Sequence, residues 1–316
     1  KEDEDKYKTE SESIQNQKSL LIHYAVERGW DTVACPAPED PARLEQKELR
    51  RAASRLSFAT MTSLPIQVLW TTLATLILTV CGVNFMGPNT IGDFPPTAYY
   101  LISSIASFLS IVLPFSFFLF FGKRKLSDTV LVEKNGVLNS VLLVFAGLAV
   151  SVLMNIPANL ISQLLEGAGL NGDANTADLL AMTPVQALTM FVSVVLVAPV
   201  TEEFAFRSVT TAVMRRWGDW PAVIFSALIF GMAHYSIQSL PVVLMAGFVM
   251  ALLYVRTRNI WVNIFVHMLN NLLATLPIAL EGLVGADAAN IASNLLTYIV
   301  YGLGLVALVV LLIRNF

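Results

Sequence analysis

The sequence predicts an all-α membrane protein: a polytopic transmembrane helix bundle of about eight spans, preceded by a short polar N-terminal segment. Of its 316 residues, 55% are hydrophobic and 14% are charged, and the mean hydropathy is +0.65. Twenty-two of the 43 Asp, Glu, Lys and Arg residues lie within the first 55 positions. The remainder consists of long apolar runs separated by short loops, which is typical of membrane proteins and not of soluble globular ones.

Residues 1–56 are expected to form a polar cytoplasmic segment. Residues 1–18 are charged and poor in apolar side chains, so this part is expected to be disordered. Pro41 follows an acidic residue and predicts the start of an amphipathic helix. That helix could lie on the membrane surface or serve as a solvated linker. We expect no cleavable signal peptide, because no long apolar run lies near the start of the sequence.

Eight apolar runs follow, with lengths that suit the roughly 20 residues a helix needs to cross a bilayer. The fifth and sixth runs are short, so they could equally form one tilted hairpin that does not fully cross. We divide the runs into N-terminal transmembrane helices at 57–180 and a core with the candidate site at 181–316. The predicted spans are 62–84, 97–121, 136–155, 186–212, 221–236, 240–255, 260–280 and 291–313.

Basic residues occur in alternate loops, which predicts the orientation of the chain. The stretches 85–96, 156–185 and 281–290 contain acidic residues but no Lys or Arg, whereas the other loops are basic. We therefore expect both termini in the cytoplasm. The short loops and the absence of a targeting signal favour a bacterial inner (plasma) membrane. The net charge of -3 does not indicate nucleic-acid binding, and Cys35 and Cys81 do not indicate a disulfide framework.

An acidic pair within the fourth run is the first candidate site. Glu202 and Glu203, with Arg207, directly follow a long uncharged stretch. An ionisable side chain in a bilayer costs about 2.5–3.5 kcal/mol on insertion scales, so such residues indicate a functional site. On a helix, Glu203 and Arg207 share a face and can pair, whereas Glu202 points about 100° away without a local partner. Pro199 is expected to kink this helix and to free a carbonyl group.

Two of the three histidines lie on later apolar runs. His234 lies near the end of the fifth run, and His267 shares one face of the seventh run with Asn271. Counting about 1.5 Å per residue from the basic loops places Glu202, His234 and His267 at a similar depth. A lone histidine in a membrane helix is as often a packing residue as a catalyst, but two beside an acidic pair indicate a site. Asn263, one turn before His267, is expected to have a supporting or packing role.

Three short motifs in these runs resemble those of the CPBP intramembrane proteases. This family includes the type II CAAX prenyl protease and bacterial bacteriocin-processing or immunity proteins. The motifs occur in the family's order on successive apolar segments, within about residues 180–280. They are Glu202-Glu203-x-x-x-Arg207, Phe230-x-x-x-His234 and His267-x-x-x-Asn271.

The resemblance implies a glutamic endopeptidase that cuts a peptide bond inside the bilayer, in substrates that include prenylated CAAX-type proteins. It implies that Glu202 is the general base and that His234 is its partner in activating water. His267 and Asn271 would donate hydrogen bonds to the oxyanion of the tetrahedral intermediate. The implied partners are the lipid bilayer and a peptide or lipidated protein substrate.

The resemblance also implies a supporting role for Glu203, which Arg207 would hold ionised beside Glu202. Simple charge compensation of Glu203 would use the same contact. No cofactor is expected, because the family is regarded as metal-independent. Carboxylates with two histidines could bind zinc, but the His-Glu-x-x-His spacing of common zinc proteases is absent, so a metalloprotease-like site is the minority interpretation.

Two functions of other classes stay open. A non-proteolytic membrane scaffold or bacteriocin-immunity protein would keep these residues only to bind a partner, which does not require a base and oxyanion donors together. A proton-coupled transporter could use Glu202 and Glu203 as a relay, but it would predict internal repeats, and none is visible.

Overall fold

The computed structural model describes His23 and residues 41–80, 96–122, 124–170, 183–234, 237 and 239–314. Residues 1–18, which are expected to be disordered, lie outside the described residues. The same is true of both cysteines and of almost all of the loop 85–96. The chain divides into two compact units, Lys1–Glu48 and Leu49–Phe316. The site lies in the second unit, whereas the predicted boundaries at 56/57 and 180/181 stay predictions.

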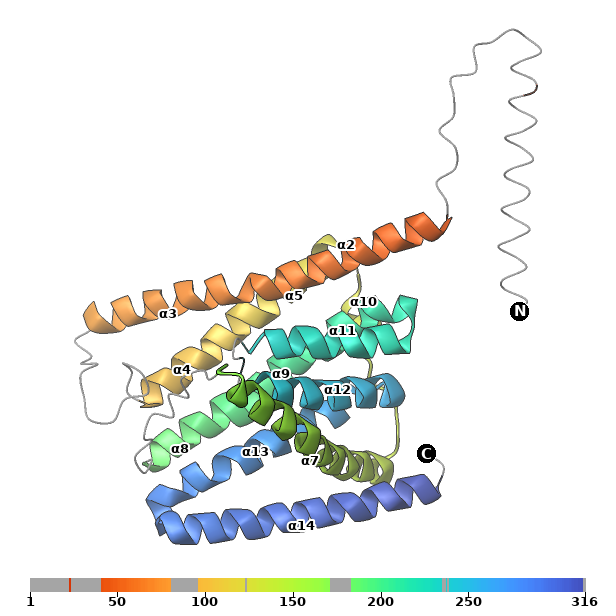
Figure 1. Ribbon diagram of the computed structural model, residues 1–316. Helices are drawn as coiled ribbons and strands as arrows, with labels where there is room; N and C mark the ends of the chain where they lie inside the picture. The colour runs from red at the N-terminus through yellow and green to blue at the C-terminus, as the bar shows by residue number, and fades with distance from the viewer. Residues whose placement is uncertain are drawn as a thin grey trace. The chain divides into compact units, whose positions relative to one another are not determined.

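Helices form almost all of the described structure (Figure 1). The described residues form no strand, and their one extended pairing is an isolated bridge between Val132 and Asn259. Apolar runs become helices because a bilayer offers no partner to an exposed backbone N–H or C=O group. The elements are α2 (Pro41–Met61), α3 (Ser63–Val80), α4 (Pro96–Ser107), η1 (Phe108–Val112), α5 (Leu113–Phe121), α6 (Leu126–Thr129), α7 (Val137–Gly167), α8 (Pro184–Met190), η2 (Phe191–Val197), α9 (Ala198–Glu202), η3 (Glu203–Thr211), α10 (Ala212–Met214), η4 (Arg215–Trp217), α11 (Asp219–Met232), α12 (Leu240–Thr257), α13 (Ile260–Val284) and α14 (Ala286–Ile313).

Within the described ranges, seven helices are long and apolar enough to cross a membrane. The predicted all-α bundle is therefore confirmed, with the fifth run forming α11, an apolar helix of only 14 residues. α7 continues to Gly167, well past the predicted end at residue 155, because the residues that follow are largely apolar. The seven candidates are Ala42–Val80, Tyr100–Phe121, Val137–Gly167, Pro184–Trp217, Leu240–Thr257, Ile260–Val284 and Ala286–Ile313.

The fourth span, Pro184–Trp217, is not a regular α-helix. It alternates between α-helical and π-helical segments, so η2 precedes the acidic pair and η3 begins at Glu203. In the π register, the N–H of Ala198 donates to the carbonyl of Ser193, five residues earlier. Single π-helical turns occur often at functional sites, and they change which side chains share a helix face.

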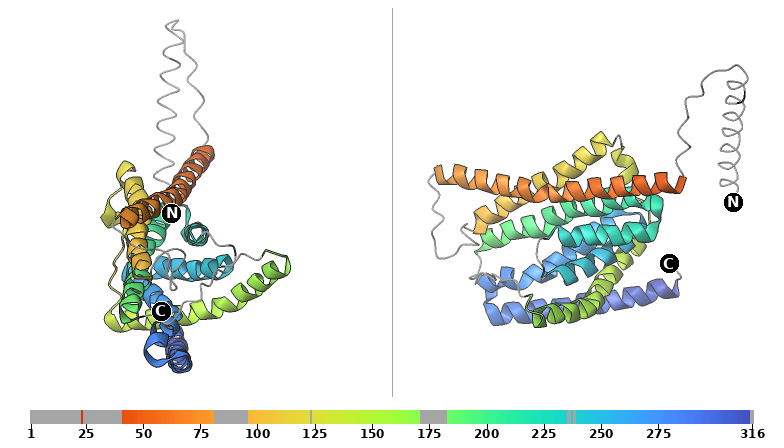
Figure 2. Two further views of the ribbon diagram at one scale, coloured as in Figure 1. Left: turned by 90° about the vertical axis from the view of Figure 1, so that its left-hand side faces the viewer. Right: turned by 45° about the horizontal axis from the view of Figure 1, so that its top comes forward.

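The helices that carry the three motifs pack against one another. α11 lies beside α12 and contacts η3, while α13 contacts η2, α9 and η3. α13 and α14 form a hairpin, visible in Figure 1 and Figure 2, whose turn contains Gly285 at a φ of 83° that favours glycine. α14 packs closely on α7. The acidic pair, both membrane histidines and Asn271 therefore come from neighbouring helices.

Candidate active site

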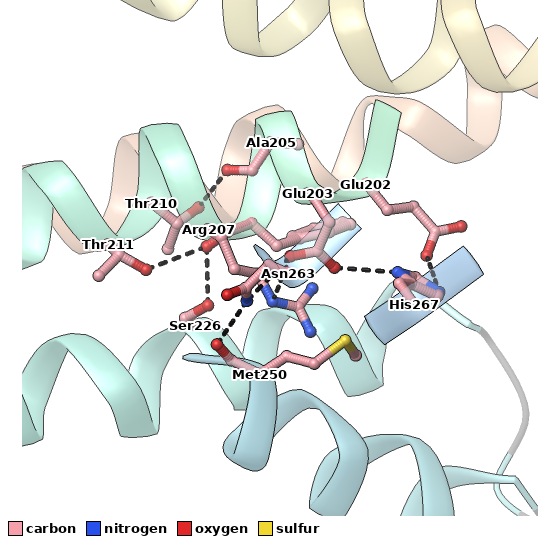
Figure 3. A network of polar contacts seen from close by, with 11 residues as sticks. Glu202, Glu203, Ala205, Arg207, Thr210, Thr211, Ser226, Met250, Asn263 and His267 are labelled. Atoms are coloured by element: carbon pink, nitrogen blue, oxygen red, sulfur yellow. Dashed lines mark hydrogen bonds and ion pairs between the residues drawn. The ribbon is translucent and has the colours of Figure 1, made fainter. Parts of the chain in front are cut away.

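Glu203 is the centre of the polar network (Figure 3). Its side chain is fully buried, and three side chains offer donors to its carboxylate. Arg207 Nε lies 3.3 Å from Oε2, Asn263 Nδ2 lies 3.3 Å from Oε2, and His267 Nδ1 lies 2.9 Å from Oε1. A buried carboxylate without such partners would be very costly. The expected Glu203–Arg207 pair is thus present, and Asn263 and His267 complete it.

Arg207 is as deeply buried as Glu203, and its guanidinium group lies over an aromatic ring. The Cζ atom is 4.1 Å from the centroid of the Phe230 ring, which is a cation–π contact. The Nε contact with Glu203 is an ion pair without hydrogen-bond alignment, and the Nη atoms have no hydrogen-bond partner in the described part of the chain. The ring face of Phe230 is therefore a second contact, beside the Glu203 carboxylate, that stabilises this cation.

His267 lies between the two carboxylates. Its Nδ1 contacts Glu203, and its Nε2 is 3.7 Å from Oε2 of Glu202. An ionised carboxylate only accepts hydrogen bonds, so Nδ1 carries the hydrogen that is shared with Glu203. Nε2 is the ring nitrogen that faces Glu202. The distance of 3.7 Å is too long for a hydrogen bond, so this contact does not tie Glu202 down.

Glu202 differs from its neighbour in accessibility. Its side chain is 16% exposed, whereas that of Glu203 is 0% exposed. Glu203 accepts from several buried donors, while the contact drawn for Glu202 in Figure 3 is the long one to His267. The two adjacent carboxylates thus have different surroundings: Glu203 is buried among donors, and Glu202 is partly accessible to solvent.

His234 follows the C-terminal end of α11 and is exposed. Its Nδ1 lies 2.8 Å from the carbonyl oxygen of Phe230, so Nδ1–H donates there and Nε2 stays available. The ring of Phe230 is edge-on to both histidines, with centroid distances of 4.7 Å to His234 and 6.0 Å to His267. Phe230 therefore brings the two histidines into one region. A direct partnership of His234 with Glu202 stays a prediction.

The two asparagines of α13 have unlike partners. Asn263, expected only in a supporting role, donates to Glu203 and, at 2.6 Å, to the carbonyl of Met250 on α12. Asn263 lies four residues before His267, and this spacing was the one feature of the sequence that placed it on the same helix face as that histidine. Asn271 instead donates at 2.9 Å to the carbonyl of Val194 in η2. That contact is not apparent from the sequence, because it joins residues 77 positions apart.

A metal site was the minority interpretation. In the ranges that the structure describes, no group of three or more His, Cys, Asp or Glu side chains is arranged to hold a metal ion.

Comparisons with known proteins point to one family. Residues 184–273, which include all three motifs, match the family model described as type II CAAX prenyl endopeptidase Rce1-like. A protein of Bacillus subtilis (strain 168), named "Putative membrane peptidase YdiL", is 31% identical over 140 residues. That match covers 44% of this chain and 57% of the relative. No solved structure shows a significant match. The segment that contains the site is therefore similar to the type II CAAX prenyl endopeptidases and to a membrane peptidase relative.

Proposed function

We propose that this protein is an intramembrane endopeptidase that hydrolyses a peptide bond of a membrane-associated substrate with a glutamate-activated water. The observation that carries the proposal is the contrast between the adjacent carboxylates. The Glu203 carboxylate is buried and accepts from neighbouring donors. The Glu202 carboxylate is partly exposed and lies beside His267, whose ring Glu203 orients. One carboxylate is built into the scaffold, and the other is free to accept a proton.

The proposed reaction uses Glu202 first as a base and then as an acid. The oxygen of water attacks the peptide carbonyl carbon while one of its protons moves to Glu202, with Nε2 of His234 orienting the water. His267, protonated on both ring nitrogens, donates from Nε2 to the developing oxyanion. Glu202 then transfers its proton to the leaving nitrogen as the C–N bond breaks, which yields a carboxylic acid and an amine, and the acid then gives its proton to the amine.

We further propose a substrate anchored at the membrane, including peptides with a prenylated C-terminus, and a location in a bacterial plasma membrane with both termini in the cytoplasm. The position of Glu202 and His267 on helices long and apolar enough to cross a membrane supports the first part. The alternation of basic and acidic loops supports the second.

The test is cleavage of a quenched fluorescent peptide library, with prenylated C-terminal peptides included, by the purified protein in detergent. The wild-type protein should cleave equally well with and without a metal chelator. Glu202→Gln and His234→Ala should each abolish this cleavage. The matched control is Glu166→Gln, which changes an exposed carboxylate at the end of α7. Loss of activity with chelator would favour zinc. Failure of the wild-type protein on every peptide would favour a scaffold or immunity protein.

A further inference from the structure

Asn271 connects the third motif to the backbone just ahead of the first. Its side-chain Nδ2 donates to the carbonyl oxygen of Val194, 2.9 Å away and 77 residues earlier in the chain. Both residues are partly buried. The bond joins α13 to η2, the π-helical segment that leads into the Glu202–Glu203 pair.

The carbonyl of Val194 needs this donor because of Pro199. In η2 the hydrogen bonds run from each N–H to the carbonyl five residues back, and Ala198 bonds to Ser193 in this register. The next bond of the series would run from residue 199 to Val194, but proline has no N–H group. A carbonyl left unpaired at this depth is costly, since lipid cannot supply a donor. The amide of Asn271 takes the place of the missing N–H.

We propose that Asn271 is a positioning residue, which supplies the hydrogen bond that Pro199 cannot make and thereby fixes the direction of Glu202. Glu202 follows Pro199 by three residues on the same short helix, α9, so the geometry of the change from the π to the α register sets where its carboxylate lies. This role rests on the proposed function of Glu202 as the base. It differs from the oxyanion donation that the family resemblance implies, because one N–H of the amide is committed to Val194.

A double-mutant cycle on thermal unfolding in detergent tests the bond. Asn271→Ala should lower the unfolding midpoint by about 2–4 °C in the presence of Pro199. Pro199→Ala restores an N–H that can bond to Val194, so adding Asn271→Ala to it should lower the midpoint by less than half as much. The matched control, Asn270→Ala, should shift both backgrounds equally. An equal loss from Asn271→Ala in both backgrounds overturns the proposal.

Kinetics test the positioning. Asn271→Ala should lower kcat at least tenfold and leave KM within twofold, and the loss should shrink when residue 199 is alanine. Asn270→Ala should keep both constants. A kcat that Asn271→Ala leaves unchanged overturns the positioning role, and a kcat loss with an additive unfolding cycle assigns Asn271 to oxyanion donation alone. If the wild-type protein cleaves no peptide, the proposed function fails, while the unfolding cycle still decides the link between Asn271, Val194 and Pro199.

Discussion

At the scale of single residues, the neighbouring Glu202 and Glu203 differ in burial and in their role in the stability of the fold. The Glu203 carboxylate is fully buried and compensates the equally buried guanidinium of Arg207. Removing one partner of a buried pair leaves an uncompensated charge in a low-dielectric site. The Glu202 carboxylate is partly exposed and carries no such structural burden.

We therefore expect Glu203→Gln to destabilise the protein by about 3–5 kcal/mol, because Arg207 would lose its counter-charge. Glu202→Gln should change stability by no more than about 0.5 kcal/mol while it removes activity. Thermal unfolding in detergent and peptide cleavage, measured on the same preparations, check both statements. Equal stability of the two variants would contradict the division of roles.

Phe230 is the residue through which the cation and both histidines meet. Phe230→Leu removes the cation–π contact with Arg207 and the edge-on contacts with His234 and His267. A cation–π contact is worth about 0.5–2 kcal/mol, so we expect a lower unfolding midpoint and a kcat reduced at least tenfold. Phe225→Leu, a change of the same size on the same helix, is the control and should keep kcat. Equal effects of the two variants would contradict the role of the Phe230 ring.

At the scale of elements, the packing of α14 on α7 depends on one glycine. A Cβ atom added at Gly304 would lie 2.5 Å from the carbonyl oxygen of Phe145 and 2.9 Å from the Cβ of Ala149. Small residues let membrane helices approach this closely. Gly302, on the same helix, has nothing within 4 Å of the equivalent position.

Gly304→Ala is thus expected to force α7 and α14 apart and to cost about 1–3 kcal/mol. Gly302→Ala should be neutral or stabilising, because alanine favours a helix over glycine by about 0.5–1 kcal/mol. The unfolding midpoints of the two variants in detergent provide the comparison. A loss from Gly302→Ala as large as that from Gly304→Ala would show that this close approach does not limit stability.

The elements also show which parts of the site the sequence could predict. The pairing of Glu203 with Arg207 depends on a local spacing, and it survives even though the segment is π-helical. The π-helical turns themselves were not predicted, because apolar residues fit either register and Pro199 was the one visible signal. The contact of Asn263 with Glu203 joins residues 60 positions apart. Such a contact depends on how α13 packs on the fourth span, and one sequence does not specify that packing.

At the scale of the whole molecule, two basic loops lie at the same end of the bundle. The loop between α5 and α7 contacts the corner between α12 and α13 through the Val132–Asn259 bridge. An ion pair of 2.9 Å also joins Glu133 to Arg258, and the hydroxyl of Tyr254 donates to the carbonyl of Thr129. Basic residues flank both loops, so the contacts agree with the charge pattern that places these loops on one side.

This arrangement predicts opposite accessibility for two exposed residues, Ser127 in the α5–α7 loop and Asp287 at the start of α14. In a variant with Cys35 and Cys81 replaced by serine, a cysteine at position 127 should react with a membrane-impermeant maleimide only in inside-out vesicles. A cysteine at position 287 should react in intact cells. The same end of the bundle holds the basic loops, so Asp219→Cys, beside Arg215 and Arg216, should follow position 127. Labelling of positions 127 and 287 from the same side would contradict the orientation. Between the two positions, α7, the fourth span and α13 each cross the membrane once, and the α11–α12 pair returns the chain to the side on which it began. The number of crossings is therefore odd, which places positions 127 and 287 on opposite sides.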